Sequence, residues 1–156
     1  MNLNGMPHAE MPNNKVQSDS FYPQLSIQEL SENYAIATEY GNNVDMVTTK
    51  LTEAAFFVNN ELSEYNVINW STFNKLEEIS NEKIDGIDRL TTLYKKAVYS
   101  LAKSNLLISK LGETHRDQQA TQSEVAIDSK KYWKNQAFSA IRQIMSVSEN
   151  ISVELI

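Results

Sequence analysis

The chain has 156 residues, no cysteine and a formal net charge of −6. This length indicates a single domain, and the absence of cysteine excludes disulfide bonds and thiolate metal sites. Residues 1–85 carry 4 Lys/Arg against 13 Asp/Glu, whereas residues 86–156 carry 10 against 7. The acidic first half argues against a protein that coats nucleic acid. The N-terminal sequence lacks the pattern of a secretory signal and no apolar run is long enough to span a membrane, so we expect neither.

The first 18 residues are polar and contain two prolines and scattered methionines. Such a segment cannot bury enough apolar surface to offset the entropy of ordering, so we predict a disordered arm over residues 1–18. A helical domain over residues 19–150 should follow. Its first helix is predicted over residues 26–34, because Ser26 and Glu29 form a capping box at its start.

A second amphipathic helix is predicted over residues 44–65, where apolar residues recur every three or four positions. Phe56 and Phe57 are adjacent, so one of them must point away from the apolar face. A shorter, weaker helix is expected over residues 72–79, and a long helix over residues 121–147 begins with a second capping box.

The longest unbroken helical period spans residues 87–111 and predicts the central helix of the domain. Asp85 is a suitable N-cap, with Asp88 near the helix start, and Gly112 suits the C-terminal end. We therefore predict an all-α fold, a small helical bundle around this helix. The apolar stripe of the helix contains Ile87, Leu90, Tyr94, Ala97, Leu101 and Ile108, widened by Val98 and Ala102.

Two groups of side chains on the central helix lie away from that stripe. Tyr99 and Leu107 are predicted interface residues, buried against another subunit, although single exposed apolar residues are also common. The four basic residues at seven-residue spacing form a predicted ridge that would contact DNA phosphates or an acidic partner, or that simply keeps an outer face soluble. The ridge residues are Arg89, Lys96, Lys103 and Lys110.

The chain ends in the sequence ISVELI, residues 151–156, which is rich in β-forming residues. We predict a short extended C-terminal tail in which Ile151, Val153 and Leu155 alternate to one face. It would dock on the segment around Phe21, on a neighbouring subunit or on another partner, where backbone hydrogen bonds provide affinity. These three residues are further interface candidates.

No constellation of catalytic residues is recognisable in the sequence. The only two histidines are His8, in the predicted arm, and His115, alone in a polar loop. No zinc-ligand spacing or glycine-rich phosphate loop is present. We expect no enzyme activity, no cofactor and no metal site, and the composition is typical of an assembly module.

Several segments together resemble the head completion proteins of temperate tailed phages. The most specific are LYKKAVYSLAKSNLL (residues 93–107), preceded by IDGIDRL (84–90), and the terminal VELI (153–156). FYPQLSIQEL (21–30) and FFVNNEL (56–62) extend the resemblance upstream. The sequence departs from the family pattern around residues 65–82 and in the loop 112–120.

The resemblance implies a structural protein of the virion that is assembled in the host bacterial cytoplasm and binds the portal protein after DNA packaging. It further implies a head-tail adaptor, a homo-oligomeric ring at the portal vertex, with a dodecamer as one stoichiometry to consider. The ring would face further connector or tail components and lie near the packaged DNA, with no membrane partner. Two alternatives stay open, a DNA-binding helical module and a module that binds a host factor.

Overall fold

The computed structural model describes residues 15–17, 19–36, 43–114 and 120–154, of which 108–114, 120–126 and 147–154 are described by their helical backbone alone. Most of this part of the chain is helical, which confirms the predicted all-α bundle. The helices are α1 (Ile27–Asn33), α3 (Val44–Asn69), α4 (Arg89–Thr114) and α5 (Ala120–Glu154). Smaller elements are β1 (Lys15–Val16), β2 (Leu25–Ser26), β3 (Lys83–Ile84), β4 (Ile87–Asp88) and a turn of 3₁₀ helix, η1 (Leu76–Glu78).

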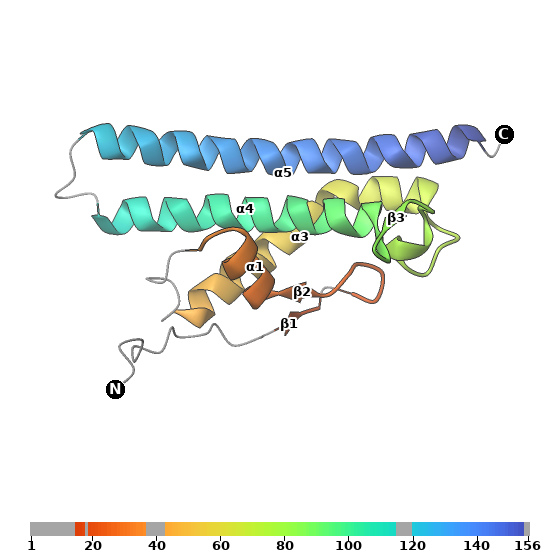
Figure 1. Cartoon of the computed structure of the whole chain (residues 1–156), viewed down its shortest axis with the longest axis horizontal. Helices are drawn as coiled ribbons and strands as arrows, with labels where there is room; N and C mark the ends of the chain where they lie inside the picture. Colours follow the sequence, from red (N-terminus) through yellow and green to blue (C-terminus); the bar gives the residue numbers. More distant parts are fainter. Residues whose placement is uncertain (1–14, 18, 37–42, 115–119, 155–156) are drawn as a thin grey trace.

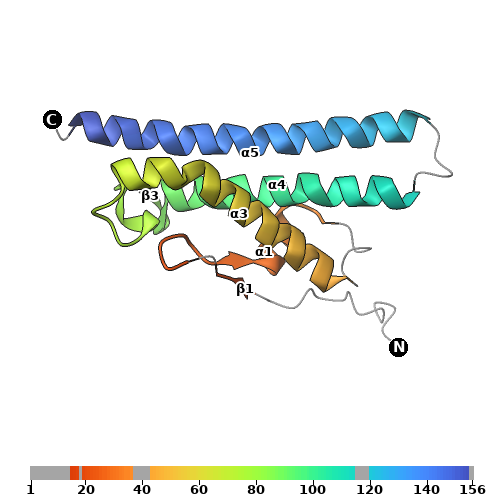
Figure 2. The same cartoon turned by 180° about the vertical axis from the view of Figure 1, so that it is seen from behind.

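The helix α4 lies at the centre of the bundle, as the sequence predicts. α4 and α5 run side by side and antiparallel along the long axis of the molecule (Figure 1). α3 crosses the far side of α4 at an angle, and the C-terminal part of α3 lies near α5 (Figure 2). α1 and the β1–β2 pair lie on the side of α4 away from α5 (Figure 1).

The apolar stripe of α4 forms the core of the bundle. Leu90, Tyr94, Ala97 and Leu101 are all buried, which confirms the main positions of the predicted stripe. The stripe packs against the buried face of α3, whose members again recur at helical spacing. These α3 residues are Val47, Leu51, Ala54, Ala55, Val58 and Leu62.

The start of α4 differs from the prediction. Asp85 does not cap the helix, because it lies with Gly86 in the two-residue turn of the β3–β4 hairpin. Both residues have positive φ angles (50° and 77°), as the turn of a tight hairpin requires. Asp88 is the cap instead, since both of its carboxylate oxygens accept from the backbone N–H of Thr91 at 3.1 Å. Ile87 therefore belongs to β4 and is exposed, not part of the apolar stripe.

Other helix boundaries also differ from the predicted ones. α4 continues through Gly112 to Thr114, so this glycine does not end the helix. α3 extends to Asn69, and the weak helix expected over residues 72–79 is reduced to the single turn η1. The first helix is confirmed, with Ser26 accepting from the backbone N–H of Glu29 at 3.2 Å.

Both predicted chain ends need correction. Lys15 and Val16 pair with Ser26 and Leu25, so the ordered chain begins before residue 18; residues 1–14 and 18 lie outside the described residues. At the other end α5 is helical through Glu154, so the predicted extended tail is wrong over residues 151–154. The side chains of Ile151 and Val153, and all of Leu155 and Ile156, lie outside the described residues.

We expect Leu101→Ala to lower the free energy of unfolding by about 2–5 kcal/mol, because Leu101 is buried between α4 and its neighbours and its removal leaves a cavity. Urea unfolding followed by circular dichroism measures the change. Phe56→Ala is the matched control, since Phe56 lies exposed on α3. A loss below about 0.5 kcal/mol in Leu101→Ala would contradict its assignment to the core.

Candidate interaction surfaces

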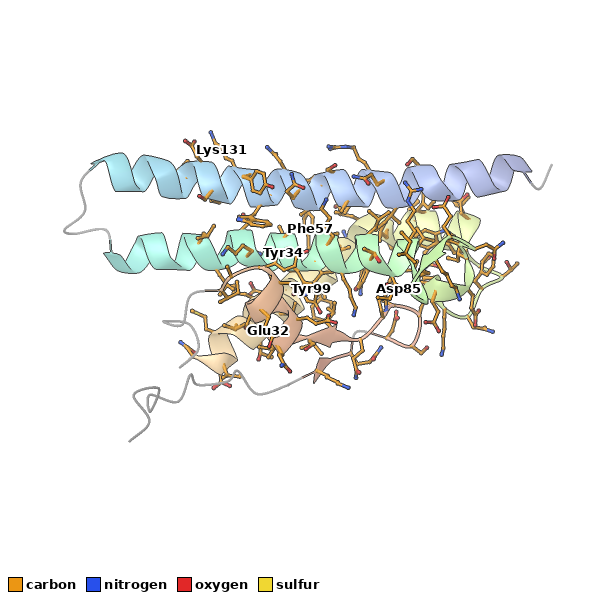
Figure 3. All side chains as sticks on the ribbon, viewed as in Figure 1. Glu32, Tyr34, Phe57, Asp85, Tyr99 and Lys131 are labelled. Atoms are coloured by element: carbon orange, nitrogen blue, oxygen red, sulfur yellow. The ribbon has the colours of Figure 1, made fainter. Side chains whose placement is uncertain are left out.

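Tyr99 lies inside the molecule and not on a subunit interface. It is only 2% exposed, between α4 and α1 (Figure 3). Its hydroxyl donates to Glu29 Oε2 at 2.6 Å and accepts from the Ser26 backbone N–H at 2.9 Å. The surface that was expected to meet a second subunit is thus covered by α1 of the same chain, and the prediction for Tyr99 is wrong.

The same contacts bind the start of α1 to α4. Lys95 Nζ donates to both carboxylate oxygens of Glu29 at 3.1 Å. In a capping box the Glu29 side chain would reach back to the Ser26 backbone N–H directly; here the Tyr99 hydroxyl stands between them. Burial, followed by the hydrogen bond to the Glu29 carboxylate, raises the pKa of Tyr99 well above its ordinary value. We refer to Ser26, Glu29, Lys95 and Tyr99 as the α1 clasp.

The basic ridge is not a continuous free surface. Arg89 forms an ion pair with Glu82 at 2.9 Å. Lys103 donates to the Ala35 carbonyl at 2.9 Å and lies 5.9 Å from the ring centroid of Trp133 on α5. Desolvation lowers the pKa of Lys103. Two of the four ridge cations therefore make contacts within the chain, while Arg89 stays exposed.

The other predicted site residues stay untested. Lys96 and Leu107 are half-buried, and the side chain of Lys110 lies outside the described residues. A role for Leu107 in an interface, and for Lys96 and Lys110 in binding DNA or a partner, remains a prediction. The alternating face of Ile151 and Val153 is excluded by the helical backbone.

The structure reveals an apolar surface that the sequence reading missed, at the β3–β4 hairpin. Ile84 is 82% exposed and Ile87, its cross-strand neighbour, is 58% exposed. Beside them a half-open hollow of about 940 Å³ extends to Thr92 and Leu93 on the first turns of α4. The signal was present, because Asp-Gly flanked by two isoleucines is a strong hairpin pattern. We call Ile84, Ile87 and this hollow the hairpin surface.

α3 and α5 expose further apolar and charged side chains. Phe56 and Phe57 are both at least partly exposed, as are Val67 and Ile68 near the end of α3. On α5, Ile127 and Tyr132 are exposed beside Lys131. Large exposed apolar side chains in groups mark surfaces that bind other proteins.

The described residues contain no cluster of His, Cys, Asp and Glu that could hold a metal ion. His8 and His115 lie outside this part of the chain. No described helix is long and apolar enough to cross a bilayer.

We expect Tyr99→Phe to destabilise the protein by about 1–3 kcal/mol with little change in overall helix content, because it removes the acceptor of the Ser26 N–H and a donor to Glu29. Urea unfolding measures the loss. Tyr132→Phe is the matched control, since Tyr132 is exposed on α5. Equal stability of the two variants would show that the hydrogen bonds of the Tyr99 hydroxyl contribute nothing to stability.

Stability should fall as the pH rises above about 10, the pKa of an unperturbed tyrosine. Burial raises the pKa values of Tyr22, Tyr34 and Tyr99, so the folded chain keeps protons that the unfolded chain releases. This contribution is fully present below the unfolded pKa and is lost above it. The urea midpoint at increasing pH measures the effect, and Tyr99→Phe should show a shallower decline. An identical decline in both proteins would contradict the assignment to Tyr99.

The comparison with protein-family models matches residues 16–156 to the family described as phage head completion protein (GPL). No curated protein and no solved structure shows significant similarity to the chain. The matched range includes the α1 clasp, the hairpin surface and every described helix.

Proposed function

Since this chain belongs to the family of phage head completion proteins (GPL), we propose that it binds the portal vertex after DNA packaging and forms a head-tail adaptor ring. Membership of the family is the observation that carries the proposal. It makes the protein a structural component associated with the virion, and we propose no enzymatic step for it. The portal protein and the next connector or tail component are its proposed partners.

The fold supports an adaptor role because it holds exposed apolar groups on a rigid helical frame. The hairpin surface lies at one end of the bundle (Figure 1), and its two isoleucines are largely exposed. Apolar side chains beside a hollow are typical anchors of protein–protein contacts. We assign the hairpin surface to the contact with the portal or with the component that follows it.

The DNA-binding alternative has less support. Arg89 and Lys103 are engaged within the chain, which leaves at most part of the ridge to contact phosphates. The described residues offer no observation that favours a host factor over a virion partner. We therefore expect the purified protein not to show the strong, steeply salt-dependent DNA binding that a DNA-binding module would have.

The test is complementation of a phage that lacks this gene, combined with capture of its portal protein by the purified full-length chain. We expect wild type to restore infectious particles and to retain the portal protein. Wild-type chain that neither restores particles nor retains portal protein would overturn the proposal.

Ile84→Asp/Ile87→Asp should reduce portal or connector binding at least tenfold, because it places two charges in an apolar contact. The melting temperature should change little, since both side chains are exposed. Ile84→Val/Ile87→Val is the matched control and should bind normally. Undiminished particle yield with the aspartate variant would remove the hairpin surface from the proposed contact.

A further inference from the structure

One flank of α3 carries a charged and apolar pattern that the bundle leaves largely exposed, although Phe57 also contacts Phe138 of α5. Phe57, Glu61, Glu64 and Ile68 recur at steps of four, three and four residues, which places them on one side of a helix. Ile68 is 70% exposed, Phe57 is 39% exposed, and both glutamates are exposed. The flank is acidic in the middle and apolar at both ends.

One flank of α5 carries the same spacing with the opposite charge. Ile127, Lys131, Lys134 and Phe138 again follow steps of four, three and four residues. Ile127 is 44% exposed and both lysines are exposed, while Phe138 is partly buried. Lys131 is labelled in Figure 3 on the side of α5 away from α4. This flank is basic in the middle and apolar at both ends.

The charge contrast extends beyond these eight residues. Residues 51–74 contain three acidic and no basic residues, whereas residues 129–148 contain four basic and no acidic residues. The two flanks are therefore complementary in sign, in spacing and in the position of their apolar ends. Opposed patterns of this kind steer association and select the partner.

Within one chain the two flanks meet at one apolar residue each, Phe57 and Phe138, but their charged residues do not pair with each other. α3 and α5 meet where the ring of Phe57 lies 5.9 Å from that of Phe138 and where Tyr65 donates to the Met145 carbonyl at 2.6 Å. In this alignment Glu61 is level with the turn around Arg142, 11 residues along α5 from Lys131, or roughly 16 Å of helix. Among the described residues no ion pair involves Glu61, Glu64, Lys131 or Lys134.

We propose that the α3 flank of one copy docks on the α5 flank of a second copy, with Glu61 facing Lys131 and Glu64 facing Lys134. Phe57 then lies opposite Ile127, and Ile68 lies opposite Phe138, so that apolar contacts close both ends of the charged pairs. The contact is heterologous, because each copy offers a different surface to each neighbour, and heterologous contacts build rings when they close.

The parallel direction of the two helices follows from the ring, and this part of the inference rests on the proposed function. All copies in a ring point the same way along its axis. α3 and α5 run in roughly the same direction within one chain, with α3 inclined to α5 (Figure 2), so a ring axis along the length of the bundle would keep them near-parallel between neighbours. The charged pairs select the neighbour and the exposed apolar residues supply most of the affinity.

The absence of cysteine allows a direct test. Glu61→Cys/Lys131→Cys in the full-length chain, treated with a short bismaleimide linker, should give a ladder of products larger than a dimer, both in concentrated purified protein and in completed heads. Glu32→Cys/Lys131→Cys is the matched control, because Glu32 is an exposed carboxylate on α1, outside both flanks (Figure 3). It should give no ladder.

Charge reversal provides the second test. Glu61→Lys/Glu64→Lys should lower the yield of species larger than a dimer at least tenfold, as should Lys131→Glu/Lys134→Glu, each measured by sedimentation velocity on chains that keep Phe57 and Ile127. Mixing the two reversed proteins should restore these species, which simple misfolding could not do. Helix content should equal that of wild type in each variant.

The outcomes separate this inference from the proposed function. If the purified cysteine variant forms a ladder but the wild-type chain fails to complete heads, the proposed function is overturned and the contact is retained. If heads are completed but the Glu61→Cys/Lys131→Cys chain in them gives only monomers or dimers after linking, the contact is overturned and the function is retained. If reversing the charges of one flank leaves the yield of species larger than a dimer unchanged, the contact would also be overturned.

Discussion

The bundle depends on the burial of α4 around most of its circumference. Leu90, Tyr94 and Leu101 face one way, and Tyr99 faces another, yet all of them are buried. A helix with so much apolar surface must be covered by several neighbours at once. α5 covers its length, α3 crosses one side, and α1 closes the remaining side through the α1 clasp. A seven-residue helix such as α1 is not stable alone, so it depends on these contacts in turn.

This burial decides where the protein can meet partners. On α4, Lys95 binds Glu29 of α1, and Lys103 is partly desolvated between Ala35 and Trp133. The exposed large apolar side chains lie instead on the hairpin surface, on α3 and on α5. The proposed adaptor ring would need separate surfaces for the ring neighbours and for the components above and below it. The described residues provide apolar groups at the end of the bundle and along its helices.

An aromatic cluster ties the N-terminal segment to the same core. The ring of Tyr22 stacks on Tyr94 of α4 at 4.7 Å, and Phe21 stacks on Trp70 at 6.0 Å. The backbone N–H of Leu76 donates to the Phe21 carbonyl at 3.0 Å. Trp70 is almost fully buried where α3 ends, so the polar connector that follows is anchored at its start. These contacts join segments 49 to 72 residues apart in the chain and fix the segment that leads from α3 to the β3–β4 hairpin.

The sequence by itself determined the helices, their amphipathic faces and the central place of α4. Helical periodicity is a local property, and Leu101 or Val58 reveals its burial through its spacing alone. Capping is also local, which is why Ser26 was predicted correctly. The short hairpin was local as well, and Asp85-Gly86 could have been assigned to it from the turn pattern.

Tertiary structure decided which side of each helix was already occupied. Tyr99 and Lys103 look like outward residues on an isolated helix, and only the positions of α1 and Trp133 show that Tyr99 is buried and that Lys103 contacts neighbouring elements. The ISVELI segment has extended propensity, yet it continues α5 through Glu154. A cooperative helix extends at little cost once it has begun, so a preceding helix outweighs the weak strand preference of a few residues. The sequence determined which side of each helix is apolar. The packing of segments that are distant in the chain determined which of these sides stay exposed, and local sequence patterns carry no information about that packing.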